Sequence, residues 1–295
     1  MTTLKILLLA TACAVAFNAT AAITVLDDDA KPVTLLKPAM RVIALAPHAT
    51  ELVYAAGGAD RIVAAGEYSD YPEQAKKLPR VGDSRQFDME RIAVLRPDLV
   101  VVWLHGSSER QIDQVRALGI PVFQSEPGKL ADIASSLSRL GKLMGTEAVA
   151  NAAAADLRKQ LAELRAKYGG RSPVRLFYQV SDKPLYTLNG EHIVSDALRL
   201  CGAQNIFAHM TIKAPSVSIE AVLQENPEAI VSGGEGKVEG GVAMWTGFSS
   251  MTAVRRDNLF RVNGNLLNRA GPRMIAGTAS LCEKIELARQ HRRTP

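Results

Sequence analysis

Two histidines follow apolar runs in this sequence and are placed to take part in binding chemistry. His48 follows the run 41–46 and Pro47, and His105 follows the run 99–103. Such runs are typical of buried strands, and open parallel sheets bind ligands beyond the carboxyl ends of their strands. His48 is therefore a candidate for contact with a ligand or a metal, although a hydrogen bond at a helix start is the commoner role.

Motifs of enzymes and metal sites are missing from the sequence. There is no Gly-x-Ser-x-Gly elbow and no phosphate-binding loop, and 233–236 follows a strand-like run without opening a helix. His192, His209 and His291 lack the spacing of metal ligands. We therefore expect no enzyme, no cofactor and no metal site, with a secreted α/β enzyme as the alternative.

The N-terminal segment predicts export from the cytoplasm. Residues 1–22 combine Lys5, a short apolar run and Ala19-Thr20-Ala21, which is typical of a cleaved signal peptide. The alternative is a lipoprotein acylated at Cys13. We favour cleavage, which leaves a soluble protein outside the cytoplasm.

Two cysteines remain after the predicted cleavage. Cys201 and Cys282 form an even pair in an oxidising compartment, which favours a disulfide between them. Two buried free thiols are the alternative.

The 295 residues, with a formal net charge of +5 and 47% hydrophobic residues, suit about two globular domains. The basic residues are scattered among acids, so nucleic-acid binding gains no support. Strand-like and helix-like runs alternate, which predicts parallel sheets. We expect an α/β protein of two Rossmann-like lobes, 23–145 and 169–295. One long rigid helix at 146–168 should join them, because that segment lacks Pro and Gly and places Leu157, Leu161 and Leu164 on one face.

One local pattern occurs twice, 130 residues apart. Asp88-Met89-Glu90 and Ser218-Ile219-Glu220 each start a helix-like run that leads to Pro, an acid and a strand-like run. Capping residues and a following Glu are common at helix starts in general. Together with the shared alternation of elements, however, the repeat indicates two related lobes.

The ordered set of short motifs resembles the helical-backbone class of periplasmic substrate-binding proteins, which serve ABC importers for cobalamin, haem and ferric siderophores. The likeness covers 41–288 and is greatest to the cobalamin-binding members. The motifs are Arg41–Pro47, Thr50–Leu52, Tyr68–Pro72, Met89–Ile92, Pro97–Val100, Glu109–Gln111, Leu200–Gly202, Asn205–Phe207, Arg269 with Pro272-Arg273, and Leu281-Cys282.

This resemblance implies a periplasmic monomer that captures cobalamin or another corrinoid between its lobes. It then delivers the ligand to a permease dimer at the inner membrane. The resemblance implies ligand contacts by a tyrosine, two cleft aromatics and one loop: Tyr68, Trp103, Tyr186, and Asn265, Leu266, Leu267, Asn268 and Arg269. It also implies permease docking by Glu90 and Glu220 and a disulfide between Cys201 and Cys282.

The sequence departs from the cobalamin-binding members at two cleft positions. Ser84 and Ala214 stand where those proteins have tryptophans, and the loop 265–269 lacks their acids. A different corrinoid is one reading of these departures. Haem or a ferric siderophore is the alternative ligand. His48 and His105 are candidate iron ligands that support the haem alternative.

Overall fold

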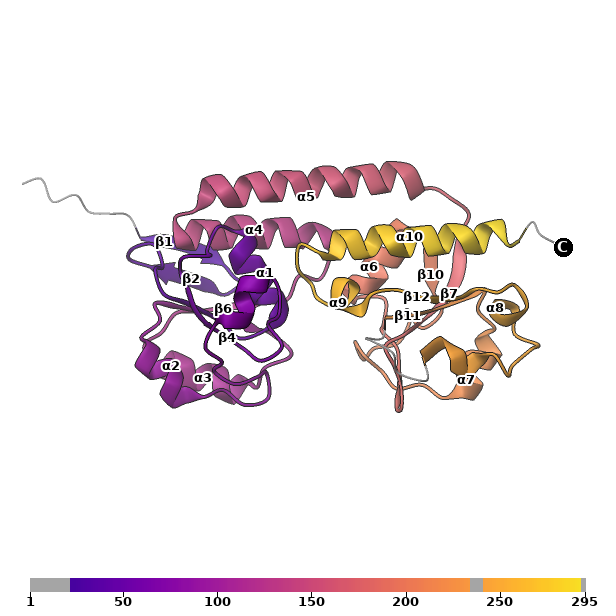
Figure 1. Cartoon of the computed structure of the whole chain (residues 1–295), viewed down its shortest axis with the longest axis horizontal. Helices are drawn as coiled ribbons and strands as arrows, with labels where there is room; N and C mark the ends of the chain where they lie inside the picture. Colours follow the sequence, from indigo (N-terminus) through magenta and orange to yellow (C-terminus); the bar gives the residue numbers. More distant parts are fainter. Residues whose placement is uncertain (1–21, 234–240, 293–295) are drawn as a thin grey trace, which may run out of the picture.

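The computed structural model describes residues 22–233 and 241–292, in which two α/β lobes lie beneath a layer of helices (Figure 1). Except for its last residue, the predicted signal peptide lies outside the described residues, as does Cys13. In the described part of the chain, no helix is both long and apolar enough to cross a membrane.

Each lobe contains a four-stranded parallel sheet of the same topology. In the N-terminal lobe the strands lie in the order β4-β3-β5-β6, and in the C-terminal lobe in the order β10-β7-β11-β12. The strands of the first sheet are β3 (Val42–Ala44), β4 (Ile62–Ala65), β5 (Leu99–Trp103) and β6 (Val122–Ser125). Those of the second are β7 (Val174–Gln179), β10 (Ala203–Asn205), β11 (Ala229–Ser232) and β12 (Leu259–Arg261). In both sheets the first strand lies between the second and the third, which confirms the prediction of two related α/β lobes.

The central strands are mostly apolar and buried because both faces of each sheet are covered. In β5, Leu99 and Val101 face one hydrophobic cluster, whereas Val100 and Val102 face another. The same alternation occurs in the C-terminal lobe, where Ile230 and Val231 of β11 face different clusters. This burial on both sides is the reason that continuous apolar runs mark the strands in the sequence.

Helices cover the sheets of both lobes. In the N-terminal lobe they are α1 (Pro47–Ala55), α2 (Met89–Leu95), α3 (Glu109–Ala117) and α4 (Leu130–Met144). In the C-terminal lobe they are α6 (Ile193–Leu200), α7 (Ile219–Glu225), α8 (Thr252–Arg255), α9 (Gly264–Leu267) and α10 (Met274–Gln290). Two hairpins, β1 (Ile23–Leu26) with β2 (Pro32–Leu35) and β8 (Ser181–Asp182) with β9 (Leu185–Tyr186), and two 3₁₀ helices, η1 (Glu73–Lys77) and η2 (Gly241–Trp245), complete the described elements.

The repeated sequence pattern corresponds to two equivalent helices, α2 and α7. The Asp88 carboxylate accepts a hydrogen bond from the Arg91 N–H at 3.0 Å, and the Ser218 hydroxyl accepts one from the Ala221 N–H at 3.1 Å. Each helix leads into the third strand of its sheet. The capping interpretation is therefore correct for both helices, and their equivalent places confirm that the lobes are related.

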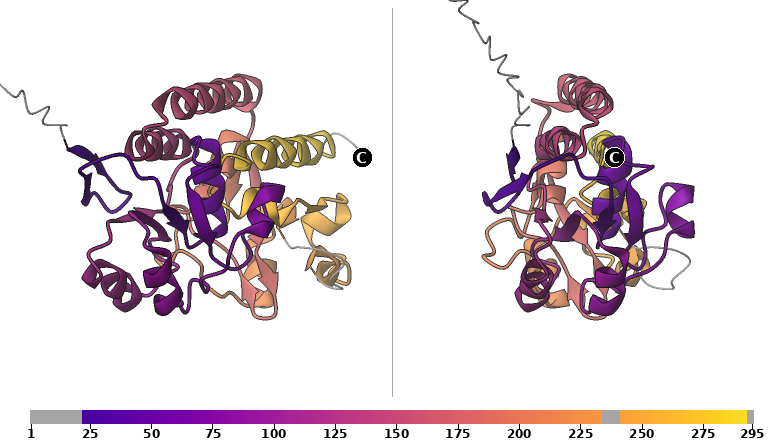
Figure 2. Two further views of the ribbon diagram at one scale, coloured as in Figure 1. Left: turned by 60° about the vertical axis from the view of Figure 1, so that its left-hand side comes forward. Right: turned by 90° about the vertical axis from the view of Figure 1, so that its left-hand side faces the viewer.

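The long helix α5 (Glu147–Tyr168) is the outermost element of the helical layer. In Figure 1, α4 and α10 lie end to end beneath it, and both views of Figure 2 show these two helices between α5 and the lobes. Leu157 and Leu161 are buried, as predicted from their spacing. The Thr146 hydroxyl does not cap the helix; it donates to the Ala56 carbonyl oxygen at 2.6 Å instead.

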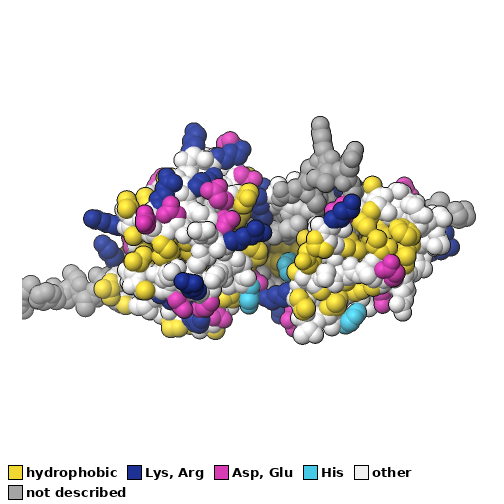
Figure 3. Space-filling model, turned by 90° about the horizontal axis from the view of Figure 1, so that it is seen from below, with side chains coloured by type: hydrophobic (Ala, Val, Ile, Leu, Met, Phe, Trp, Pro, Cys, Tyr) yellow, Lys and Arg dark blue, Asp and Glu magenta, His cyan; other side chains and the backbone are white. Residues whose placement is uncertain are grey.

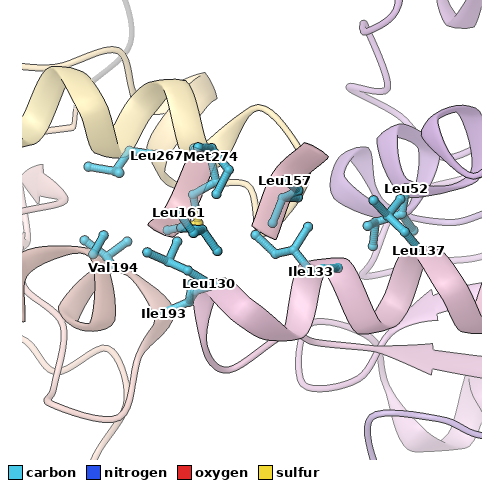
Figure 4. Close-up of a cluster of buried hydrophobic side chains, with 14 of the residues drawn as sticks. Leu52, Leu130, Ile133, Leu137, Leu157, Leu161, Ile193, Val194, Leu267 and Met274 are labelled. Atoms are coloured by element: carbon cyan, nitrogen blue, oxygen red, sulfur yellow. The ribbon is translucent and has the colours of Figure 1, made fainter. Parts of the chain in front are cut away.

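One hydrophobic core extends from lobe to lobe through these helices. Figure 4 shows side chains of α1, α4, α5, α6, α9 and α10 in a single cluster. The labelled members are Leu52, Leu130, Ile133, Leu137, Leu157, Leu161, Ile193, Val194, Leu267 and Met274. The connecting helix is therefore one part of a wider apolar junction, which the sequence interpretation did not anticipate.

The predicted disulfide is present in the C-terminal lobe. Cys201, at the end of α6, is bonded to Cys282 of α10, and both residues are fully buried. The bond therefore attaches the first helix after β7 to the last helix of the chain.

Candidate functional site: a cleft between the lobes

A cavity of about 160 Å³ lies between the two lobes. Its N-terminal-lobe wall includes His48, Trp103 and Glu126, and its C-terminal-lobe wall includes His192 and Lys213. Figure 3 views the molecule from below and shows the surface hollowed between the lobes, with histidine and basic side chains in the hollow. Trp103 and Glu126 stand at the carboxyl ends of β5 and β6, where open parallel sheets bind ligands.

His48 and Trp103 form one wall of this cavity. Their rings meet edge to face with centroids 5.9 Å apart, and Trp103 is 40% exposed. The His48 Nε2 atom lies 3.2 Å from the Ser125 carbonyl oxygen. Burial lowers the pKa of His48, so its imidazole is neutral at neutral pH. His48 therefore bonds to a neighbouring strand and does not provide the hydrogen bond at a helix start that we considered as its alternative role.

His192 on the opposite wall is also neutral. Its Nδ1 atom accepts a hydrogen bond from the Val194 N–H at 3.2 Å, which caps α6. Burial lowers the pKa of His192 to about 4. The lining thus combines an aromatic ring and two neutral imidazoles with four charged side chains, those of Glu126, Glu191, Lys213 and Arg269.

An ion pair joins the lobes at one side of the cavity. The Lys213 ammonium group donates to the Glu126 carboxylate at 2.9 Å, and His105 Nδ1 lies 2.5 Å from the other oxygen of Glu126. Partial burial acts to raise the pKa of the Glu126 carboxyl, but the hydrogen bonds from Lys213 and His105 outweigh it and lower that pKa below its usual value. His105 is therefore engaged by a carboxylate, and Glu126 carries a negative charge at neutral pH.

A second set of ion pairs joins the lobes beside Arg269. The Arg269 guanidinium binds Asp70 and lies 3.6 Å from Glu51, and Arg273 donates to Glu51 at 3.0 Å through Nε. Glu51 is 3% exposed, and the Arg273 guanidinium lies 3.9 Å from the centre of the Tyr71 ring. The hydrogen bond from Arg269 holds the pKa of the Asp70 carboxyl below its usual value. These contacts link α1 and the loop 66–72 of one lobe to 269–273 of the other.

The predicted ligand-contacting segment 265–269 is only partly exposed to the cavity. Asn268 and Arg269 line it, and the Asn268 side chain accepts from the Tyr178 hydroxyl at 2.6 Å. Leu267 is fully buried in the core shared by the lobes and does not line this cavity, and its role as a ligand contact stays a prediction. Asn265 and Leu266 are half-buried and do not line this cavity. The cause is that 264–267 forms the short helix α9, which turns Leu267 toward the core.

The two predicted tyrosine contacts lie outside the cavity lining. Tyr68 is 76% exposed and has a positive φ of 63°, and Tyr186 is 38% exposed in the β8–β9 hairpin. Their roles as ligand contacts stay predictions. Ser84 is half-buried and Ala214 is exposed. Neither position carries an aromatic ring that could line the cleft.

Glu90 and Glu220, the predicted docking residues, are both exposed in the first turns of α2 and α7. Figure 1 places these two helices at the lower ends of the two lobes, opposite α5. A hydrogen bond from its own backbone N–H and a second from Ser218 lower the pKa of the Glu220 carboxyl. The two glutamates therefore lie on the same side of the molecule.

Several charged residues that pair across the lobes were not predicted as site residues, although three of them lie within the quoted motifs. They are Glu51, Asp70, Glu126, Lys213 and Arg273. Their partners lie far away in the chain: the Arg269–Asp70 pair spans 199 residues and the Arg273–Glu51 pair spans 222. No local motif carries such pairings. In the described ranges 22–233 and 241–292, no group of three or more histidines, cysteines and acids could hold a metal ion.

The sequence matches the profile of the periplasmic binding protein family over residues 42–266. The chain belongs to this family. It is 38% identical over 254 residues to the vitamin B12-binding protein of Vibrio cholerae serotype O1, and the match covers 86% of this chain and 91% of the relative. It is 39% identical over 248 residues to the vitamin B12-binding protein of Yersinia pestis, covering 84% and 86%.

Solved structures of the family have the same fold. The crystal structure of the periplasmic vitamin B12 binding protein of Vibrio cholerae superimposes with a TM-score of 0.80, covering 85% of this chain and 98% of that one at 38% identity. A periplasmic haem-binding protein from Pseudomonas aeruginosa gives a TM-score of 0.70 at 26% identity, covering 83% and 91%. The resemblance drawn from the sequence motifs is thereby confirmed.

Proposed function

We propose that this protein captures cobalamin or a related corrinoid in the cleft between its lobes, in the periplasm, and delivers it to the permease of an ABC importer. The observation that carries the proposal is the 38% identity to a vitamin B12-binding protein over 86% of the chain. The shared topology of the two lobes and the position of the cleft support it.

The chemistry of the cleft suits a corrinoid. A corrin ring has apolar faces and a fringe of amide groups, so it needs aromatic surface and neutral hydrogen-bonding partners rather than a charged clamp. Trp103 offers an exposed ring. The Asn268 amide accepts from Tyr178 and donates to the Gly233 carbonyl oxygen, which leaves its second N–H for a ligand. Tyr68, Tyr186 and Arg269 are the further contacts we propose.

Haem is the second candidate, because a haem-binding protein is among the structural relatives. An imidazole that binds haem iron needs a free nitrogen facing the ligand. The His48 Nε2 atom already faces a carbonyl oxygen, and His105 Nδ1 faces a carboxylate. Each imidazole has a second nitrogen, and a hydrogen bond at one nitrogen is the usual way to orient the other toward a metal. Haem therefore stays the second candidate, and the titration with both ligands decides between them.

We further propose that Glu90 and Glu220 dock the loaded protein on the permease. Their carboxylates are exposed at equivalent positions on two related lobes, and a permease of matching symmetry can meet each one with an arginine. Bidentate pairing of arginine and carboxylate fixes orientation as well as affinity.

A titration of the purified mature protein with cobalamin, cobinamide and haem tests the ligand. We expect the corrinoids to bind with a one-to-one stoichiometry and to be recovered chemically unchanged. Haem should bind more weakly. Binding of haem alone, or chemical conversion of the corrinoid, would contradict the proposal.

A further inference from the structure

The cavity between the lobes is narrow where Glu126 and Lys213 face each other across it. Its volume is about 160 Å³, whereas sites for drug-sized ligands measure roughly 300–1,000 Å³ and a corrinoid is larger than such ligands. A corrinoid that binds in the cleft must therefore displace the contacts that span this cavity.

Lys213 and Glu126 make such a contact. Glu126 follows β6 in the N-terminal lobe, and Lys213 lies between β10 and α7 in the C-terminal lobe. Both residues line the cavity, and 2.9 Å separates their charged atoms. We propose that this pair is a latch that holds the free cleft closed and that a ligand has to break.

The side chains of Glu126 and Lys213 differ in how firmly their own lobes hold them in place. The Glu126 carboxylate accepts hydrogen bonds from the backbone N–H of His105 at 2.9 Å, and the Glu126 N–H donates to Asp28 at 2.6 Å. The Glu126 side chain is 18% exposed and the Lys213 side chain is 44% exposed. The carboxylate is thus fixed in the N-terminal lobe, and the flexible lysine is the part that moves when the latch opens.

A closed latch lowers the apparent affinity for ligand. When only a fraction of the protein is competent to bind, the apparent dissociation constant is the intrinsic one divided by that fraction. Removing the latch should therefore tighten binding, which is the opposite of what loss of a ligand contact would do. The sign of the effect separates the two roles. The identity of the ligand in this inference rests on the proposed function, whereas the contact that closes the cleft does not.

The binding test uses Glu126→Gln and Lys213→Met in the full mature protein. The glutamine keeps an oxygen for the His105 N–H, and the methionine keeps most of the aliphatic stem. We expect each variant to bind cobalamin up to about fivefold more tightly than the wild type, since partly exposed ion pairs are worth up to about 1 kcal/mol. The double variant should gain no more than either single one. Equal or weaker binding by either variant overturns the latch.

The matched control is Glu73→Gln. Glu73 forms an ion pair with Lys76 at 2.8 Å, on the exposed helix η1 and outside the cavity lining. Its loss should leave the affinity for cobalamin unchanged.

A second measurement needs no ligand. The sequence holds two tryptophans: Trp103 lines the cavity, and Trp245 is fully buried. Quenching of fluorescence by acrylamide therefore reports access to Trp103. We expect stronger quenching in Glu126→Gln and Lys213→Met than in the wild type and Glu73→Gln. Unchanged quenching overturns the latch. Stronger quenching in a protein that binds no corrinoid keeps the latch and rejects the proposed ligand.

Discussion

The carboxylate of Glu51 offers the sharpest test of how the lobes are held together. Glu51 is 3% exposed and is bound by Arg273 of the opposite lobe, with Arg269 3.6 Å away. The substitution Glu51→Gln keeps the shape of the side chain and removes its charge. Two guanidinium groups then lose a shared anion at the junction of the lobes.

The expected cost follows from the burial of the partners. Breaking a buried ion pair by removing one partner costs about 3–5 kcal/mol, because a charge stays buried without compensation. Here the guanidinium side chains are 14% and 23% exposed, and Arg269 keeps Asp70. We therefore expect the free energy of unfolding to fall by about 2–3 kcal/mol, or the Tm to fall by roughly 5–10 °C.

Urea denaturation followed by circular dichroism measures this change. The matched control is Glu225→Gln, which removes the partner of Arg175 in a more exposed pair within one lobe. That pair should contribute less than about 1 kcal/mol. A loss in Glu51→Gln no larger than in this control would refute the view that Glu51 is an essential buried counter-charge.

Three further predictions concern the disulfide, the docking surface and the ligand. Replacing Cys201 and Cys282 by alanine should lower the free energy of unfolding by up to about 4.5 kcal/mol, because the disulfide closes a loop of 81 residues in the unfolded chain. The oxidised wild type should show no free thiol when it is denatured. Glu90→Arg with Glu220→Arg should keep cobalamin affinity within about threefold but abolish complex formation with the permease in a pull-down; normal pull-down would reject the docking role. Tyr68→Ala should weaken cobalamin binding by about 1–3 kcal/mol by calorimetry without lowering the Tm, because its side chain is 76% exposed; unchanged affinity would remove Tyr68 from the site.

The sequence was sufficient where the structure depends on local patterns. The cap before Met89 and the cap before Ile219 identified α2 and α7, because a helix start needs a side chain to accept its free N–H groups. Apolar runs identified the central strands, since both faces of each sheet are buried. The equivalent strand order of the two sheets agrees with the repeat, but the order itself depends on pairing between distant segments.

Features that depend on distant contacts escaped the sequence interpretation. Helix α4 and the hairpin of β1 and β2 carried no prediction, although α4 is central to the junction of the lobes. The inward position of Leu267 had a signal that was not used: two adjacent leucines stand between asparagines in 265–268, and such residues are usually buried. The ion pairs of Glu51 and Glu126 had no local signal, because the neighbours of an acid in sequence do not reveal a partner that lies far along the chain.

The hydrophobic core shared by the lobes has a consequence for how the protein denatures. Separating the lobes would expose Leu130, Leu161 and Met274 to water, although each lobe has a complete sheet of its own. We therefore expect the two lobes to unfold together, as one cooperative unit. Trp103 reports on the first lobe and Trp245 on the second, so their emission should change at the same denaturant concentration. A destabilising mutation in one lobe should therefore lower the free energy of unfolding of the whole molecule.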